Sequence, residues 1–190
     1  EQLSNAVITI SDSYHGMAIY AATAAGAFDD VTIDGVNFEH LTEKGIYTEQ
    51  LSNAVITNIT MNDVGEFGRG PAFGAAGKGE FGNGIDVNLK HGTYANIAIS
   101  NFTFTDVGSS SEPDTVLLDF GGAISIKARD DGPAYNTVPA SATNVTIANG
   151  TIIDRPIRRS DVTPHADSGA TPIRMYIATN SGGVTVSKYS

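Results

Sequence analysis

The residues best suited to chemistry occupy alternating positions in short segments spread along the chain. In "GIDVNLK" the polar positions are Asp86, Asn88 and Lys90, and in "AISIKAR" they include Lys127 and Arg129. Alternate residues of a β-strand point to the same side, so we expect these side chains to face away from the core. Such a strip offers bases, carboxylates and amides to the hydroxyl and acidic groups of a glycan.

Three related segments, "GMAIY", "GIYTE" and "PIRMYIA", extend this strip. Alignment gives one column of Tyr47, Asp86, Ser125 and Arg174, and a second of Tyr20, Glu49, Asn88, Lys127 and Tyr176, with Lys90 and Arg129 beside them. Neighbouring strands lie ~4.8 Å apart, so the members of each column are expected to stack.

The strip predicts binding of an acidic polysaccharide, because tyrosine rings stack on sugar faces and Lys or Arg pairs with uronate carboxylates. In a uronate lyase or epimerase, the groups that neutralise the carboxylate or act as base would be Lys127, Arg129 or Arg174. Tyr47 or Tyr176 would donate the proton. A lysine flanked by cations has a lowered pKa, which suits a base. The alternative is an ordinary solvated face whose opposite charges offset one another.

A second kind of segment precedes each strip strand. "DVTIDGVNF", "NAVITNITM", "NIAISNFTF" and "NVTIANGTI" each alternate apolar and polar residues on both sides of a polar pair, which predicts two short strands joined by a bend. The second bend position is occupied by Gly35, Asn58, Asn101 and Asn149. Gly and Asn tolerate a left-handed backbone, so these positions are expected to form a ladder.

Three short strands per unit cannot bury their apolar faces alone, but units wound into a coil share one core. The pattern predicts an all-β, single-stranded parallel β-helix, or solenoid, of about five to six coils. Long loop insertions are expected between strands, above all the glycine-rich stretch at 65–84. Residues 1–190 are interpreted as a single domain that is a fragment of a longer chain.

The "NVTIxN" phrases, the asparagine ladder and the following "GI" strand resemble the right-handed parallel β-helix superfamily, which includes pectate lyases, polygalacturonases and mannuronan epimerases. "LTEKGIYTEQLSNAVITNITMNDVGEFGRG", "GIDVNLK" and "ISIKARDDG" are similar to segments of secreted bacterial β-helix proteins often found with calcium-binding Gly/Asp repeats. The resemblance implies a right-handed coil in a bacterial protein that is extracellular, either secreted or on the cell surface. The D-P-H-E signature of the epimerases has no counterpart in the sequence.

Calcium is a candidate cofactor at one place. "GNGID" (82–86) matches the G-x-G-x-D core of calcium-binding nonapeptide repeats, with Asp86 as the candidate ligand. Phe81 replaces the leading glycine of that repeat and no tandem copy follows, so an ordinary strand start is the alternative.

The composition of the chain limits the classes of molecule that it could bind. The formal net charge is −10 with only 11 Lys and Arg, which argues against nucleic acid or an anionic membrane surface as a partner. No apolar run approaches the ~20 residues of a membrane span. Exposed end coils would leave unpaired strand edges, so the competing function is a structural or adhesive module of an adhesin, matrix or filament protein. Its partners would be other β-helix modules, end to end.

The segment "EQLSNAVIT" occurs at 1–9 and again at 49–57. If this offset is a multiple of the coil repeat, the copies occupy equivalent positions two coils apart.

Overall fold

The structure is a computed structural model that describes residues 8–20, 28–65, 82–90, 92–108, 122–129, 139–153, 173–177 and 182–189, the last two ranges by backbone only. Most of the predicted glycine-rich insertion, 66–81, and the start of the first repeat copy, 1–7, lie outside these ranges.

The described residues form two sheets and no helix, as the alternating apolar pattern predicts. The seven-stranded sheet consists of β1 (Ile8–Ser11), β3 (Thr32–Asp34), β4 (Val36–Leu41), β6 (Ala54–Val64), β8 (Thr93–Val107), β10 (Ser141–Ile153) and β12 (Gly182–Tyr189). The five-stranded sheet consists of β2 (His15–Ile19), β5 (Lys44–Thr48), β7 (Asn83–Leu89), β9 (Gly122–Ala128) and β11 (Ile173–Ile177).

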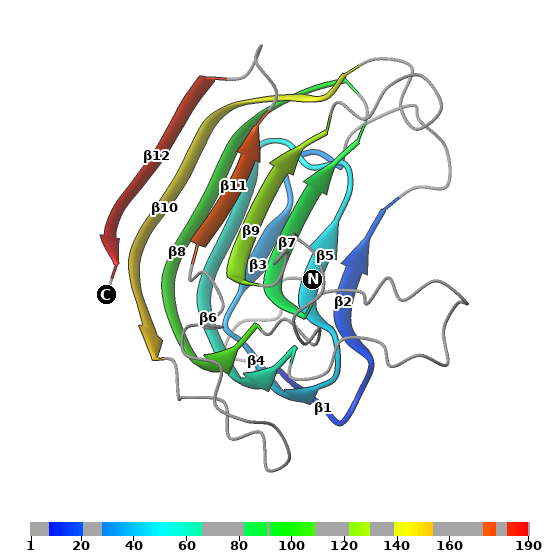
Figure 1. Cartoon of the computed structure of the whole chain (residues 1–190), viewed down its shortest axis with the longest axis vertical. Coiled ribbons are helices and arrows are strands. Elements are labelled where there is room, and N and C mark those ends of the chain that lie inside the picture. Colours follow the sequence, from blue (N-terminus) through cyan, green and yellow to red (C-terminus); the bar gives the residue numbers. More distant parts are fainter. Residues whose placement is uncertain are drawn as a thin grey trace, which may run out of the picture.

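The chain passes back and forth between the two sheets. The larger sheet has the order β1-β4-β6-β8-β10-β12, with β3 also paired to β6, and the smaller has the order β11-β9-β7-β5-β2. Figure 1 shows the strands of each sheet side by side in this order. Every paired strand is parallel to its neighbour, as expected for chain segments that return to the same sheet in the same direction.

Both sheets contribute to one apolar core. From the smaller sheet, Ile46, Ile85 and Ile124 stand in register on β5, β7 and β9 and are fully buried. The larger sheet supplies a matching column of Phe38, Met61 and Phe104, also fully buried. Stacking of like side chains from strand to strand therefore fills the interior.

The predicted left-handed bend is present at every expected position. Backbone φ is +71° at Gly35, +54° at Asn58, +53° at Asn101 and +55° at Asn149. Two short strands flank the bend only at Gly35, between β3 and β4, whereas β6, β8 and β10 run through it as continuous strands. Two further sets of left-handed residues were not predicted: Asp30, Asn53, Asn96 and Asn144, and Asp12, His40, Asp63 and Asp106.

Of the first copy the structure describes only Ile8 and Thr9. They lie on β1, which is separated from the second copy on β6 by one strand, as predicted, but the predicted equivalence of position is wrong. Thr9 pairs with Asn37, which in turn pairs with Thr60, whereas identity of the two copies would align Thr9 with Thr57. Register is set by burial of alternate side chains, and Ile10 lies beside Phe38 rather than at a bend. Sequence identity alone does not fix the position of this segment in the sheet.

Candidate functional site

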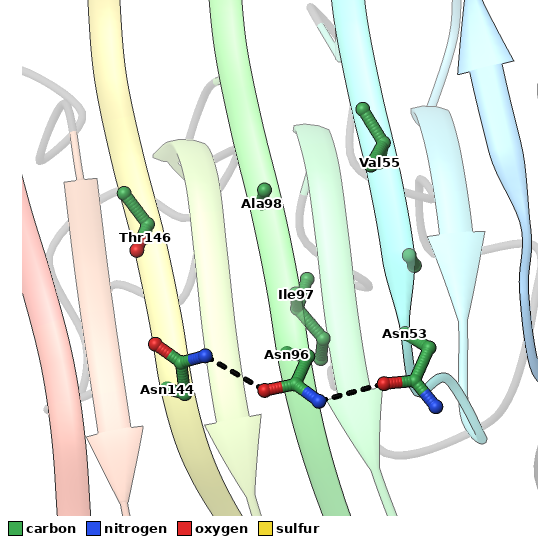
Figure 2. A pocket seen from close by; sticks show the side chains of 8 residues that line it. Asn53, Val55, Asn96, Ile97, Ala98, Asn144 and Thr146 are labelled. Carbon is green, nitrogen blue, oxygen red and sulfur yellow. Dashed lines mark hydrogen bonds between the residues drawn. The ribbon is translucent and has the colours of Figure 1, made fainter.

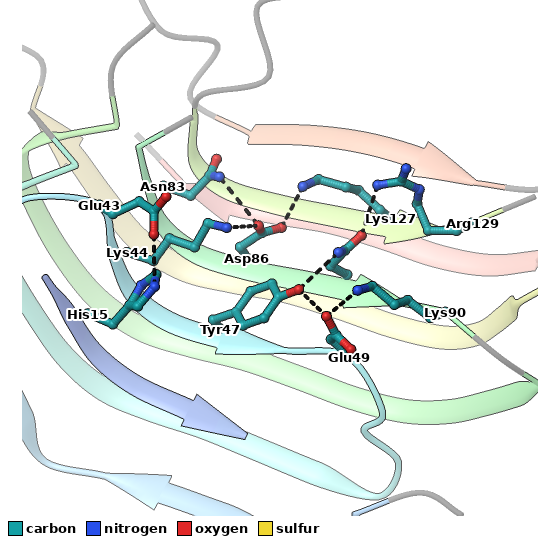
Figure 3. Close-up of polar contacts among 11 residues, drawn as sticks. His15, Glu43, Lys44, Tyr47, Glu49, Asn83, Asp86, Lys90, Lys127 and Arg129 are labelled. Atoms are coloured by element: carbon teal, nitrogen blue, oxygen red, sulfur yellow. Dashed lines mark hydrogen bonds and ion pairs between the residues drawn. The ribbon is translucent and has the colours of Figure 1, made fainter. Parts of the chain in front are cut away.

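The candidate site lies on the face of the five-stranded sheet that is opposite the core column of Ile46, Ile85 and Ile124. β5, β7 and β9 bring their alternate residues to this face because the intervening apolar residues are buried between the sheets. We call the polar and aromatic residues on this face the polar strip. Its members with described side chains are Tyr20, Lys44, Tyr47, Glu49, Asp86, Asn88, Lys90, Ser125, Lys127 and Arg129. Figure 3 shows how the side chains of Lys44, Tyr47, Glu49, Asp86, Lys90, Lys127 and Arg129 lie on this face.

The strand register places the sequence-predicted columns as expected. Tyr47 pairs with Asp86, Asp86 with Ser125, and Ser125 with Arg174. In the second column Asn88 pairs with Lys127, and Lys127 with Tyr176. Tyr20 and Glu49 directly follow the paired residues Ile19 and Thr48. The side chains of Arg174 and Tyr176 lie outside the described part of the structure, so their roles stay predictions.

Asp86 stands at the centre of the strip between two lysines. Lys127 Nζ lies 2.8 Å from Asp86 Oδ1, and Lys44 Nζ lies 3.4 Å from Asp86 Oδ2. The amide of Asn83 also donates to Asp86 Oδ2, at 3.5 Å. One carboxylate thus compensates two ammonium groups that come from the strands on either side of it.

The alternative of an ordinary solvated face does not describe the centre of the polar strip. Asp86 is 1% exposed, Ser125 is fully buried and Asn88 is 7% exposed. The ammonium groups of Lys44 and Lys127 reach Asp86 from the neighbouring strands, and the centre of the strip is desolvated although it faces away from the apolar core. The accessible part of the strip is its rim, formed by Tyr20, Tyr47, Glu49, Lys90 and Arg129.

A second set of contacts runs along this rim. The Tyr47 hydroxyl donates to Glu49, and Lys90 forms an ion pair with the same carboxylate oxygen of Glu49. Asn88 joins the rim to the centre: its amide donates to the Tyr47 hydroxyl at 3.2 Å, and its carbonyl oxygen accepts from Arg129 at 3.2 Å. The rim and Asn88 together therefore combine aromatic, acidic, amide and basic groups, as the sequence predicts.

Burial shifts the pKa of two strip residues. Desolvation, followed by the hydrogen bond to Glu49, raises the pKa of the Tyr47 phenol far above its ordinary range, so the phenol stays neutral. Desolvation lowers the pKa of Lys127; the charges of Lys44 and Arg129 act in the same direction, and Asp86 opposes it. The lowered pKa agrees with the sequence-based expectation, although burial, and not the neighbouring cations, is its first cause.

Sequence reasoning missed a third acid, Glu43, at the start of the strip. His15 Nε2 lies 2.8 Å from Glu43 Oε2, and Glu43 is fully buried. The His15 ring stacks on Tyr47 at 6.5 Å between centroids and meets Tyr14 edge-on at 4.5 Å. The sequence does hold a signal for Glu43 and Lys44, because these residues immediately precede "GIYTE". The strand and its polar face therefore begin before this segment, and Lys44 pairs directly with Asn83.

The strip carries a local excess of positive charge in an acidic chain. Every Lys and Arg side chain that the structure describes lies here, namely Lys44, Lys90, Lys127 and Arg129. Asp86, Glu49 and Glu43 offset part of this charge. With a formal net charge of −10 on the whole chain, the strip is the basic part of the described surface.

The opposite side of the protein presents a hydrogen-bonded ladder. Asn144 donates to Asn96, and Asn96 donates to Asn53, each at 2.7 Å, and Asn53 donates to Asp29 at 2.7 Å (Figure 2). These asparagines line an open hollow of about 260 Å³ beside Val55, Ala98 and Thr146. Because the side-chain amides are hydrogen-bonded to one another, we interpret the ladder as a structural feature that helps to hold β6, β8 and β10 in register.

Calcium at Asp86 stays a prediction. Within the described ranges no group of three or more His, Asp or Glu side chains is placed to hold a metal ion. Both Asp86 oxygens contact lysine ammonium groups, so a calcium ion there would have to displace them.

Comparison with known proteins adds no family: no protein-family model, curated protein or solved structure matches this chain. No helix long and apolar enough to cross a membrane occurs in the described part of the chain.

Proposed function

We propose that this protein binds an acidic polysaccharide along the rim of the polar strip. The observation that carries the proposal is the gathering of all described cationic side chains, in a chain of net charge −10, beside the exposed ring of Tyr20 and the half-buried ring of Tyr47. The two rings meet edge-on at 6.0 Å between centroids. Arg and Lys bind carboxylates and sulfates, and aromatic rings cover sugar faces, so the strip suits an anionic glycan.

Modification of the bound polymer is the more demanding form of this proposal. A lyase or epimerase needs a group to neutralise the uronate carboxylate, a base for the adjacent proton and a proton donor. Lys127, with its lowered pKa, is the candidate base, and Arg129 or Arg174 would neutralise the carboxylate. Tyr47 is a poor acid because its pKa is raised, so it serves as a hydrogen-bond donor and not as the source of the transferred proton. Lys127 must also leave Asp86 before it can react.

The architecture behind this proposal is a right-handed parallel β-helix of about five to six coils, in an extracellular bacterial protein. Strict alternation of the chain between two parallel sheets, constant strand register and bends with left-handed residues support it. In a coil of this kind the strip residues repeat at each turn, which suits a repeating polymer ligand.

A structural or adhesive module is the second candidate. Among the described strands, β1 and β12 lie at the two edges of the larger sheet, and β2 and β11 lie at the edges of the smaller. Edge strands expose backbone N–H and C=O groups that pair with another strand, so copies could join end to end. The desolvated ion cluster around Asp86 also suits a purely structural role.

Retention and turnover on a panel of alginate, pectate and glycosaminoglycans separate the two candidates. Binding predicts slower migration in gels that contain an acidic polymer, and a lyase predicts an unsaturated product that is lost in Lys127→Ala and Arg174→Ala. If no polymer retains the protein and no product forms, the polysaccharide proposal is wrong. Fibres seen by electron microscopy in that case would support the structural module.

A further inference from the structure

The buried centre of the polar strip joins three groups that can form a covalent bond with one another. They are an amine, Lys44, a carboxamide, Asn83, and a carboxylate, Asp86. Asp86 Oδ2 lies 3.4 Å from Lys44 Nζ and 3.5 Å from Asn83 Nδ2, so a single oxygen contacts both potential reactants (Figure 3).

The backbone holds the amine and the amide together. Lys44 and Asn83 are direct register partners on β5 and β7, where neighbouring strands lie ~4.8 Å apart. The Lys44 ammonium also sits over the Tyr47 ring, 4.4 Å from its centroid, which limits the positions its chain can take. Reactants fixed in this way need no encounter in solution, which removes a large part of the barrier to bond formation.

Burial supplies the remaining condition. Asn83 and Asp86 are each 1% exposed, and the Lys44 side chain is 14% exposed. Bulk water is therefore largely kept from the three groups, so it competes little with the amine for the Asn83 carboxamide.

We propose that Lys44 and Asn83 become joined by an isopeptide bond in the folded protein, with Asp86 carrying the proton. Asp86 Oδ2 takes a proton from the Lys44 ammonium, and the neutral Nζ attacks Asn83 Cγ. The proton that Nζ then loses passes through Asp86 to Nδ2, the Cγ–Nδ2 bond breaks, and ammonia departs. The products are one Nζ–Cγ amide and one ammonium ion, which forms as ammonia takes up the proton left on Asp86. No oxidant or cofactor is needed.

The bond would close a loop that contains the glycine-rich stretch 66–81. Cross-links that close long loops stabilise a fold mainly by restricting the unfolded chain. This modification is independent of polysaccharide binding, since the rim cations Lys90 and Arg129 take no part in it.

The intact mass of the purified full chain tests the inference. The wild-type protein should be lighter than its sequence by one ammonia, and a lysine-specific digest should lack cleavage after Lys44 and contain one branched peptide that joins the Lys44 and Asn83 segments. Lys44→Met, Asn83→Ala and Asp86→Ala should each restore the full mass. Asn101→Gly is the matched control, because it removes an exposed carboxamide of the larger sheet at a left-handed position and should retain the ammonia loss.

Two results would overturn the inference. One is a full sequence mass for wild-type protein whose circular dichroism shows a folded β structure. The other is a loss of water in place of ammonia, mapped to Lys127 and Asp86, because it would mean that the other lysine condenses directly with the carboxylate. The wild-type mass is decisive even if a variant fails to fold.

Discussion

Lys127 Nζ and Asp86 Oδ1 lie 2.8 Å apart in an ion pair whose side chains are 12% and 1% exposed. The two residues are diagonal neighbours, since Lys127 pairs in register with Asn88, and Asp86 with Ser125. Lys44 approaches the other Asp86 oxygen from β5, so this carboxylate links β5, β7 and β9. The negative charge of Asp86 therefore compensates the two lysine ammonium groups at the centre of the strip.

Replacement of Asp86 by asparagine should therefore destabilise the fold strongly. Removing one partner of a buried ion pair leaves its mates as uncompensated charges and costs about 3–5 kcal/mol. Urea unfolding followed by circular dichroism measures the change. Asp34→Asn is the matched control, because Asp34 is exposed and accepts from Asn58, a contact that an asparagine oxygen can also make. Equal losses in the two variants would show that Asp86 is not the electrostatic centre of the strip.

The hydrogen-bonded ladder of Asn53, Asn96 and Asn144 makes a prediction about backbone conformation. Asn96 has φ +58°, donates to Asn53 and accepts from Asn144. Asn96→Gly removes both side-chain bonds but keeps the left-handed backbone at little cost. Asn96→Ala removes the same bonds and adds a left-handed penalty of roughly 1–2 kcal/mol. Alanine should thus be the less stable variant in thermal unfolding; equal stability would contradict a left-handed residue at this bend.

An exposed histidine should report on a bend of the larger sheet. His40 Nδ1 lies 2.8 Å from Asp63 Oδ2, and this hydrogen bond, with the nearby acidic charges, raises the pKa of His40 above its ordinary 6.5. The folded state then binds the proton more tightly than the unfolded state does. The stabilising contribution is present below pH ~6.5 and fades as pH rises through the higher folded pKa.

Proton NMR titration of His40 checks this directly. The folded wild-type protein should titrate above the ordinary histidine value, and Asp63→Asn should move the pKa of His40 downward. The stability difference between wild type and Asp63→Asn should shrink as pH rises through the titration of His40. A His40 pKa that Asp63→Asn leaves unchanged would show that the pair does not form in solution.

The columns of the strip could be predicted because two local signals agree. Alternation buries Ile85 and Val87 and so turns Asp86 to the other face, and the left-handed Gly or Asn at each bend limits slippage between strands. Pairing of Tyr47 with Asp86 and of Asn88 with Lys127 follows from these signals alone. The parallel all-β arrangement follows in the same way.

Burial of the strip could not be predicted, because it depends on how long side chains lie across neighbouring strands. Alternation says that Asp86 and Lys127 face away from the core, but it does not say that two lysines meet the carboxylate in a desolvated cluster. Glu43 was missed because it precedes its strand, where alternation gives no direction for the side chain. The repeated segment misled because identity of sequence was taken for equivalence of register, which burial decides.

Affinity electrophoresis of the full chain in gels that contain an acidic polysaccharide tests the central claim most directly. Polygalacturonate and alginate are compared with a neutral glucan, and Arg129→Ala is compared with Thr103→Glu, which changes the net charge equally but lies exposed on the other sheet. Retardation should be specific to an acidic polymer and fade with added salt. Arg129→Ala should weaken it by about tenfold in Kd, as for loss of one charge-assisted hydrogen bond, and Thr103→Glu should leave it nearly unchanged. Absence of retardation, or equal weakening in both variants, would contradict a polysaccharide site on the polar strip.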